Sequence, residues 1–166
     1  MTKRPRQRTG RRGKKLLVDT NILLLYIVGS ISPDRIARHK RTDTFTVEDF
    51  LLLDRVLRQF GGIVVTPNIL TEVSNHLGQT DEKTKTKLWA LLGALVPVFD
   101  ERHIQSREAV GVAEFSRLGL TDASILACPP QDLTILTDDL HLYLALQRRG
   151  AEVINFHHLR EASWLQ

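Results

Sequence analysis

Five short apolar runs, separated by longer segments with helical spacing, constrain the fold of this chain more than any other feature. The runs occupy residues 15–19 (KLLVD), 62–66 (GIVVT), 96–100 (VPVFD), 133–137 (LTILT) and 151–156 (AEVINF). Each is too short for a typical helix, and the first two carry apolar residues in succession, as strands buried on both faces do. We therefore predict five strands.

The segments between these runs predict helices at residues 20–28, 46–60, 67–77, 81–95, 106–119, 121–128 and 138–150, with a further turn after residue 157. Thr46 with Asp49 forms a capping-box pattern, and Thr66 before Pro67 is a typical helix start. Gly119 is expected to end the helix that begins at residue 106. Strands that alternate with helices imply right-handed crossovers and a parallel sheet.

The predicted fold class is α/β: a single three-layer domain over residues 16–166, with a central parallel sheet and helices on both faces. Residues 1–15 are a separate basic tail that holds eight of the 23 Lys and Arg residues and no acid. Such a tail is expected to be disordered, because like charges repel. Two interpretations stay open: an arm that attracts nucleic-acid phosphates through Arg11, Arg12, Lys14 and Lys15, or a solvated tail.

The apolar segment after this tail is not expected to be a secretory signal. Asp19, Thr20 and Asn21 interrupt its centre, and no cleavage site of the Ala-x-Ala kind follows. No run approaches about eighteen apolar residues, so we expect no membrane span. The single cysteine, Cys128, excludes an intramolecular disulfide and a multi-cysteine metal site, and it favours a reducing, cytoplasmic setting.

Acidic residues follow the predicted strands. Asp19 ends the first strand, Glu72 lies one turn into the helix after residues 62–66, and Asp122 opens the helix after Thr121. Asp138 and Asp139 follow the strand at residues 133–137. In an open parallel sheet, the functional crevice lies beyond the carboxyl ends of the strands, so we expect these side chains to meet there.

Carboxylates that are packed together repel unless a cation offsets their charge. Oxygen ligands favour a hard ion, so Mg²⁺ or Mn²⁺ fits the predicted site, and such a site suits hydrolysis of phosphodiesters. Neutral polar residues beside the acids are expected to hold waters or to orient the carboxylates. These residues are Thr20, Asn21, Ser124 and Thr137.

Each acid also has an ordinary structural interpretation. Asp122, Asp138 and Asp139 fit the first turn or the cap of a helix, and Glu72 fits a solvated helix surface. Asp19 is the hardest to explain in this way, because apolar residues precede it and resume soon after it. The joint placement of the acids favours a site, and an α/β scaffold without a site remains an alternative.

Four segments resemble signature segments of the PIN-domain family, in the same order along the chain. They are LLVDTNILLLYI (residues 16–27), TPNILTEV (66–73), LGLTDASILA (118–127) and LTILTDDLHLYLALQRRGAEVINF (133–156). The resemblance implies a metal-dependent ribonuclease specific for single strands, a class that includes toxins of bacterial and archaeal toxin–antitoxin pairs. It assigns the family's acids to Asp19, Glu72, Asp122 and Asp139, with Asp138 as an adjacent substitute for Asp139 and Asn21 as a polar partner.

Two features depart from the small toxins of that family. One is the basic tail, and the other is the long segment 29–46, which carries Arg35, Arg38, Lys40 and Arg41. They suggest binding to RNA or docking to another macromolecule, and for the segment 29–46 a solvated connection is an equal alternative.

The leading hypothesis is an endoribonuclease that cuts single-stranded or structured RNA with Mg²⁺ or Mn²⁺. The alternative is a non-catalytic PIN-fold module that binds RNA or protein. An antitoxin or other protein partner and a homodimer remain open.

Overall fold

The computed structural model describes residues 13–129 and 131–164. The contacts predicted for Arg11 and Arg12 lie outside the described residues.

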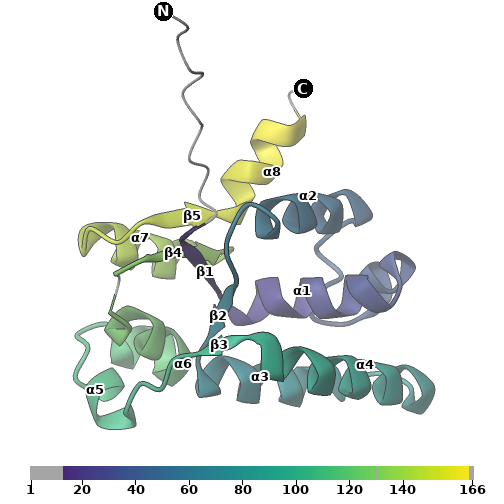
Figure 1. The fold of residues 1–166 in the computed structure, drawn as a ribbon, viewed down its shortest axis with the longest axis horizontal. Helices are drawn as coiled ribbons and strands as arrows, with labels where there is room; N and C mark the ends of the chain where they lie inside the picture. The colour runs from purple at the N-terminus through teal and green to yellow at the C-terminus, as the bar shows by residue number, and fades with distance from the viewer. Residues whose placement is uncertain (1–12, 130, 165–166) are drawn as a thin grey trace, which may run out of the picture.

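One sheet of five parallel strands forms the centre of the molecule, in the order β3-β2-β1-β4-β5 (Figure 1). The strands are β1 (Lys15–Val18), β2 (Ile63–Val65), β3 (Asp100–Glu101), β4 (Leu133–Thr137) and β5 (Val153–Asn155). Leu17 of β1 pairs with Val64 on one side and with Ile135 on the other. The chain therefore proceeds in opposite directions from the central strand, and this places a topological switch point between β1 and β4.

Eight α-helices and two 3₁₀ helices connect these strands within the described ranges. They are α1 (Thr20–Ile31), η2 (Pro33–Arg38), α2 (Val47–Leu57), α3 (Pro67–Leu77), α4 (Glu82–Leu95), η3 (Val96–Val98), α5 (Ser106–Val110), α6 (Phe115–Ala127), α7 (Leu140–Arg148) and α8 (Phe156–Trp164). Helix α1 packs against α2, α3 and α4, and α6 packs against α5 and α7 (Figure 1). Right-handed crossovers place these two groups on opposite faces of the sheet, which confirms the predicted α/β class.

The central strand and the helix after it form the core. Leu16, Leu17 and Val18 are at most 1% exposed, and the apolar side chains of α1 from Ile22 to Leu25 are as deeply buried. This helix is apolar nearly all round because it is covered both by the sheet and by other helices. The five residues of β4 are buried as well, as expected of a strand inside a parallel sheet.

Two predicted helix starts are confirmed. The Thr46 side chain accepts a hydrogen bond from the backbone of Asp49, whose carboxylate accepts one from the Thr46 backbone. The Thr66 hydroxyl accepts a hydrogen bond from the backbone of Ile69, and Pro67 is the first residue of α3. These caps pair backbone N–H groups that have no partner inside the helix.

The predicted strand at residues 96–100 is wrong over most of its length. Val96–Val98 forms the 3₁₀ helix η3, and only Asp100 of this run enters the sheet, in the two-residue edge strand β3. Pro97 has no backbone N–H to donate to a neighbouring strand, and its fixed φ suits the first turn of a helix.

The predicted single helix at residues 106–119 is also wrong. Helix α5 ends at Val110, and α6 begins at Phe115 and continues to Ala127 through a kink at Gly119. Gly119 has a φ of 83°, which is accessible to glycine but strained for other residues. The kink lets a new helical segment begin just before Thr121 and Asp122.

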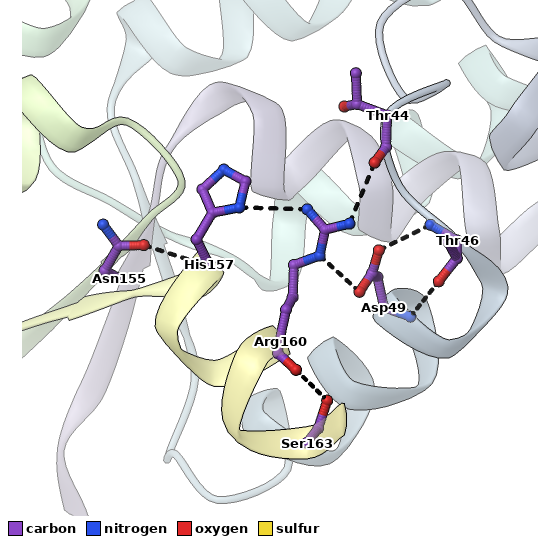
Figure 2. A network of polar contacts seen from close by, with 7 residues as sticks. All are labelled: Thr44, Thr46, Asp49, Asn155, His157, Arg160 and Ser163. Atoms are coloured by element: carbon purple, nitrogen blue, oxygen red, sulfur yellow. Dashed lines mark hydrogen bonds and ion pairs between the residues drawn. The ribbon is translucent and has the colours of Figure 1, made fainter. Parts of the chain in front are cut away.

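The C-terminal segment forms a longer helix, α8, than the single predicted turn. Arg160 connects this helix to α2 (Figure 2). Its Nε donates to the Asp49 carboxylate at 2.8 Å, and its Nη2 donates to the carbonyl of Thr44 at 3.3 Å. Its guanidinium also lies 5.4 Å from the centre of the Phe45 ring. The helix is thereby attached to the end of the segment 29–46.

Among the described residues, no helix is both long and apolar enough to cross a membrane. Cys128 is buried and forms no disulfide, and burial raises the pKa of its thiol.

Candidate active site

Four of the predicted acids line one cavity of about 220 Å³ at the carboxyl ends of the central strands. They are Asp19, Glu72, Asp122 and Asp139, which come from four separate segments of the chain. Thr20, Asn21 and Thr121 line the same cavity. The cavity therefore lies at the switch point of the sheet, where ligand sites of open α/β folds occur.

Asp19 connects the end of β1 with the segment that follows β4, so it lies at the switch point between these two strands. Its Oδ1 accepts a 2.9 Å hydrogen bond from the backbone of Ile22, and its Oδ2 accepts one of 3.1 Å from the backbone of Asp138. The side chain is 5% exposed, and burial, followed by the charge of Asp138, raises its pKa well above the usual range. Hydrogen bonds from Thr137 and the two amides lower it only in part. Asp19 thus has a structural role, and its charge also remains available to a cation.

Glu72 is held by two threonines that are neighbours of other acids. Its Oε2 accepts a 2.9 Å hydrogen bond from Thr20, which follows Asp19, and its Oε1 accepts one of 2.7 Å from Thr121, which precedes Asp122. Both carboxylate oxygens are therefore oriented by hydroxyl groups. This arrangement fixes the carboxylate while leaving lone pairs that can still bind a cation.

Asp122 is the acid most perturbed by its neighbours. Burial, followed by the charges of Asp139, Glu72 and Asp138, raises its pKa to about 7. The charges of the neighbouring carboxylates thus add to the effect of burial on Asp122. Such a group is stabilised either by a proton or by a nearby cation.

Asp138 and Asp139 differ in orientation. Asp139 lines the cavity and caps α7 through a 2.8 Å hydrogen bond from the backbone of Leu142 to its Oδ1. Asp138 accepts a hydrogen bond from the Asn21 amide at 3.2 Å. The Thr137 hydroxyl accepts one from the backbone of Asp139 at 2.9 Å, which fixes the turn. Of the two adjacent acids, Asp139 is therefore better placed to face a ligand in the cavity.

Ser124 lies away from the acids. It is fully buried, its hydroxyl donates to the carbonyl of Thr121 at 2.6 Å, and it lies 3.2 Å from the hydroxyl of Thr66. It connects α6 to the start of α3, and its effect on the site passes through the backbone of Thr121. Sequence reasoning placed Ser124 beside the acids and missed Thr121 as a partner of Glu72. The position of Thr121 directly before an acid, which mirrors Thr20 directly after one, was the available signal.

The donor set of the cavity fits a hard divalent cation. The candidate ligands are carboxylate oxygens, and burial together with neighbouring carboxylates raises the pKa values of Asp19 and Asp122, an effect that a bound cation would offset. In the described part of the chain, no three Asp, Glu, His or Cys side chains stand close enough to form a complete metal cage. A site for Mg²⁺ needs only one or two direct carboxylate ligands, because this ion keeps several waters.

The predicted RNA-binding residues are spread over the molecule. Lys14 pairs with Glu152, and Lys15 pairs with Asp100 at 2.8 Å, at the amino end of β1 and so at the edge opposite the acids. Arg35 donates to Thr84 and lies 3.5 Å from Asp81, and Arg38 lines a separate cavity. Lys40 is exposed.

Arg41 differs from these residues, because among the described residues it is the one cationic side chain that lines the acid cavity. It is exposed, and no carboxylate of the described part of the chain forms an ion pair with it within 4.0 Å. A cation beside uncompensated acids suits a site that receives a phosphate together with a metal ion.

The five-stranded parallel sheet with helices on both faces is a PIN-like fold, and solved structures share this architecture. The chain is similar to VapBC2 from Rickettsia felis, whose structure was solved with a bound DNA fragment from the promoter. The TM-score is 0.52 and the sequence identity 13%, over 85% of this chain and 98% of that one. It is also similar to PAE2754 from Pyrobaculum aerophilum, with a TM-score of 0.54 and 17% identity over 95% of this chain and all of that one. Comparison with models of protein families and with the sequences of curated proteins gives no match.

Proposed function

We propose that this protein is an endoribonuclease that hydrolyses RNA phosphodiesters with Mg²⁺ or Mn²⁺. The observation that carries the proposal is the convergence of Asp19, Glu72, Asp122 and Asp139 on one cavity at the switch point. A chance distribution of helix caps would not direct acids from four segments into one space. The PIN-domain fold supports the proposal at the level of architecture.

The cavity would hold a divalent ion, whose chemistry there would be Lewis acidity and a lowered pKa of an attacking water. Asp19 and Asp139 would hold the ion from the two halves of the switch point, because both are fixed by backbone N–H groups. Glu72, oriented by Thr20 and Thr121, would complete the ligands or position a water. Because the pKa of Asp122 is raised to about 7, binding of the ion would be coupled to loss of a proton from this carboxyl group.

Arg41 would contact a phosphate of the RNA at the mouth of the cavity. Its guanidinium is not neutralised by an ion pair with a carboxylate of the described residues, so it remains available to bind an anion. The basic residues before residue 13 would add salt-sensitive attraction along the RNA.

The likeness to VapBC2 supports a toxin-type ribonuclease with an antitoxin as protein partner. Exposed Leu140 and Leu144 on α7 offer an apolar face for that partner or for a second copy of this chain. The single, buried Cys128 supports a reducing, cytoplasmic setting.

Cleavage of a labelled single-stranded RNA and of a hairpin RNA, with Mg²⁺, with Mn²⁺ and with EDTA, tests the proposal. We expect metal-dependent cleavage that is lost in Asp122→Asn and in Asp19→Asn, and that is kept in Asp34→Asn, a change at an exposed acid of η2. Asp122 makes no hydrogen bond within the described residues through its carboxylate, so this variant separates activity from folding. Cleavage by Asp122→Asn at the wild-type rate would contradict the assignment.

A non-catalytic PIN-fold module is the second candidate, and the absence of a complete metal cage among the described residues favours it. RNA binding that persists with no cleavage in either metal, together with no measurable Mn²⁺ binding by calorimetry, would support this candidate over the nuclease.

A further inference from the structure

A second cavity of about 450 Å³ adjoins the acid cavity on the side of α3 and the segment 103–106. Glu72, Leu120 and Thr121 line both cavities, so the two cavities share a wall. The second cavity extends away from the acids between the first turn of α3 and the start of α5. A ligand that occupies the acid cavity through a phosphate can therefore extend into it.

The walls of the second cavity combine apolar surface with unused amide groups. Ile104 is half-buried, and Leu120 is 37% exposed, so both offer apolar surface to a ligand. Asn68 and Gln105 line the same space, and neither side chain has a hydrogen-bond partner among the described residues. An amide offers both donors and an acceptor, as the edge of a nucleobase does.

The charge of this cavity excludes a phosphate as its preferred occupant. Within the described residues, neither Lys nor Arg lines it, and its one carboxylate is Glu72 on the wall shared with the acids. The ring of His103 also lines it and offers a surface on which a base can stack. A flat, uncharged group with hydrogen-bonding edges fits these walls better than an anion does.

We propose that this cavity binds the nucleobase adjacent to the scissile phosphate of a single-stranded RNA. Asn68 and Gln105 contact the edge of the base, while His103 and Leu120 pack against its face. A base in this position is unpaired and turned out of its stack, so the cavity selects single-stranded segments and gives a base preference on one side of the cut. The inference rests on the proposed function for the phosphate that occupies the acid cavity.

The test compares Asn68→Ala and Gln105→Ala with wild type in the full chain, with Gln59→Ala as a matched control at an exposed glutamine of the segment after α2. Cleavage of oligoribonucleotides that vary at each position around the cut should show a base preference in wild type. The two cavity variants should reduce the preference at one flanking position by about three- to tenfold, chiefly through KM, since each removes one or two hydrogen bonds to the base. Gln59→Ala should keep it.

A binding experiment distinguishes failure of this inference from failure of the proposed function. Fluorescence anisotropy with oligo(A), oligo(C), oligo(G) and oligo(U) in EDTA measures base preference without cleavage. If no RNA is cut but both cavity variants lose a wild-type preference among these oligomers, the base cavity stands and the nuclease does not. If wild type has no base preference in either assay, or if the cavity variants keep it, the inference is overturned. Loss of binding to a protein partner with unchanged base preference would also overturn it.

Discussion

The hydroxyl of Thr121 on α6 donates a 2.7 Å hydrogen bond to the carboxylate of Glu72 on α3. These helices lie on different faces of the sheet, and the bond joins them at the edge where the acids meet. Thr121 is 9% exposed, so water does not readily replace it as the donor. The orientation of Glu72 in the cavity thus depends on a side chain that sequence reasoning did not assign to the site.

Thr121→Val should uncouple Glu72 from α6 while keeping the shape of the side chain. We expect about 1 kcal/mol lower free energy of unfolding, because one buried hydrogen bond is lost. We also expect roughly tenfold weaker binding of Mn²⁺, because the carboxylate is no longer held. Urea unfolding and isothermal titration calorimetry measure the two effects. Thr71→Val, at an exposed threonine of α3, is the control, and equal effects of the two substitutions would contradict the role of Thr121.

Asp122→Asn should change the pH dependence of stability in the metal-free protein. The folded pKa of about 7 lies above the ordinary value of 3.8, so the folded state binds the proton more tightly than the unfolded state does. This contribution is fully present below pH 3.8 and is lost as the pH rises through 7. In EDTA, the variant should therefore melt roughly 3–6 °C above wild type at pH 8 and close to wild type at pH 4.

Thermal unfolding followed by circular dichroism measures this difference. Mg²⁺ at pH 8 should raise the melting temperature of wild type more than that of the variant, because the ion replaces the proton on Asp122. Asp34→Asn should show neither effect. If Asp122→Asn changes the melting temperature by the same amount at pH 4 and at pH 8, repulsion among the cavity acids is not the cause of that change.

Arg41→Ala should weaken RNA binding more than substitution of its neighbour Lys40 does. Arg41 lines the acid cavity, whereas Lys40 is exposed outside it. We expect the affinity for single-stranded RNA to fall about five- to tenfold. The slope of the logarithm of the binding constant against the logarithm of the salt concentration should become shallower by about one, as for loss of one phosphate contact. Anisotropy titrations at several salt concentrations measure both quantities, and matching results for Arg41→Ala and Lys40→Ala would contradict this contact.

The fold was largely predictable because buried parallel strands are rich in apolar residues, as Leu16–Val18 of β1 and the leucine and isoleucine residues of β4 show. The prediction failed where apolar character was not decisive. Pro97 kept most of residues 96–100 out of the sheet, and Gly119 redirects α6 at a point where the spacing of apolar residues continues. Asp19, Asp138 and Asp139 directly follow strands, whereas Glu72 and Asp122 lie on helices and were expected at the same edge of the sheet from the order of the elements. Arg41 could be noted as basic but not placed at the cavity, because the path of the loop that precedes α2 has no periodic pattern.

The pair between Arg160 and Asp49 predicts how α8 is retained (Figure 2). The two side chains are 11% and 2% exposed and 2.8 Å apart, so neither charge is well hydrated. Arg160→Met removes the cation and leaves the Asp49 carboxylate buried, and it should lower the free energy of unfolding by about 2–4 kcal/mol. Asp49→Asn in the same chain should recover part of this loss, because the uncompensated charge is then absent. Arg149→Met, which breaks the more exposed pair with Glu114, should have a much smaller effect, because water screens that pair.

Urea unfolding of the three variants measures these changes in stability, and hydrogen exchange should become faster in α8 for Arg160→Met only. Equal losses for Arg160→Met and Arg149→Met would show that burial does not determine the strength of the first pair.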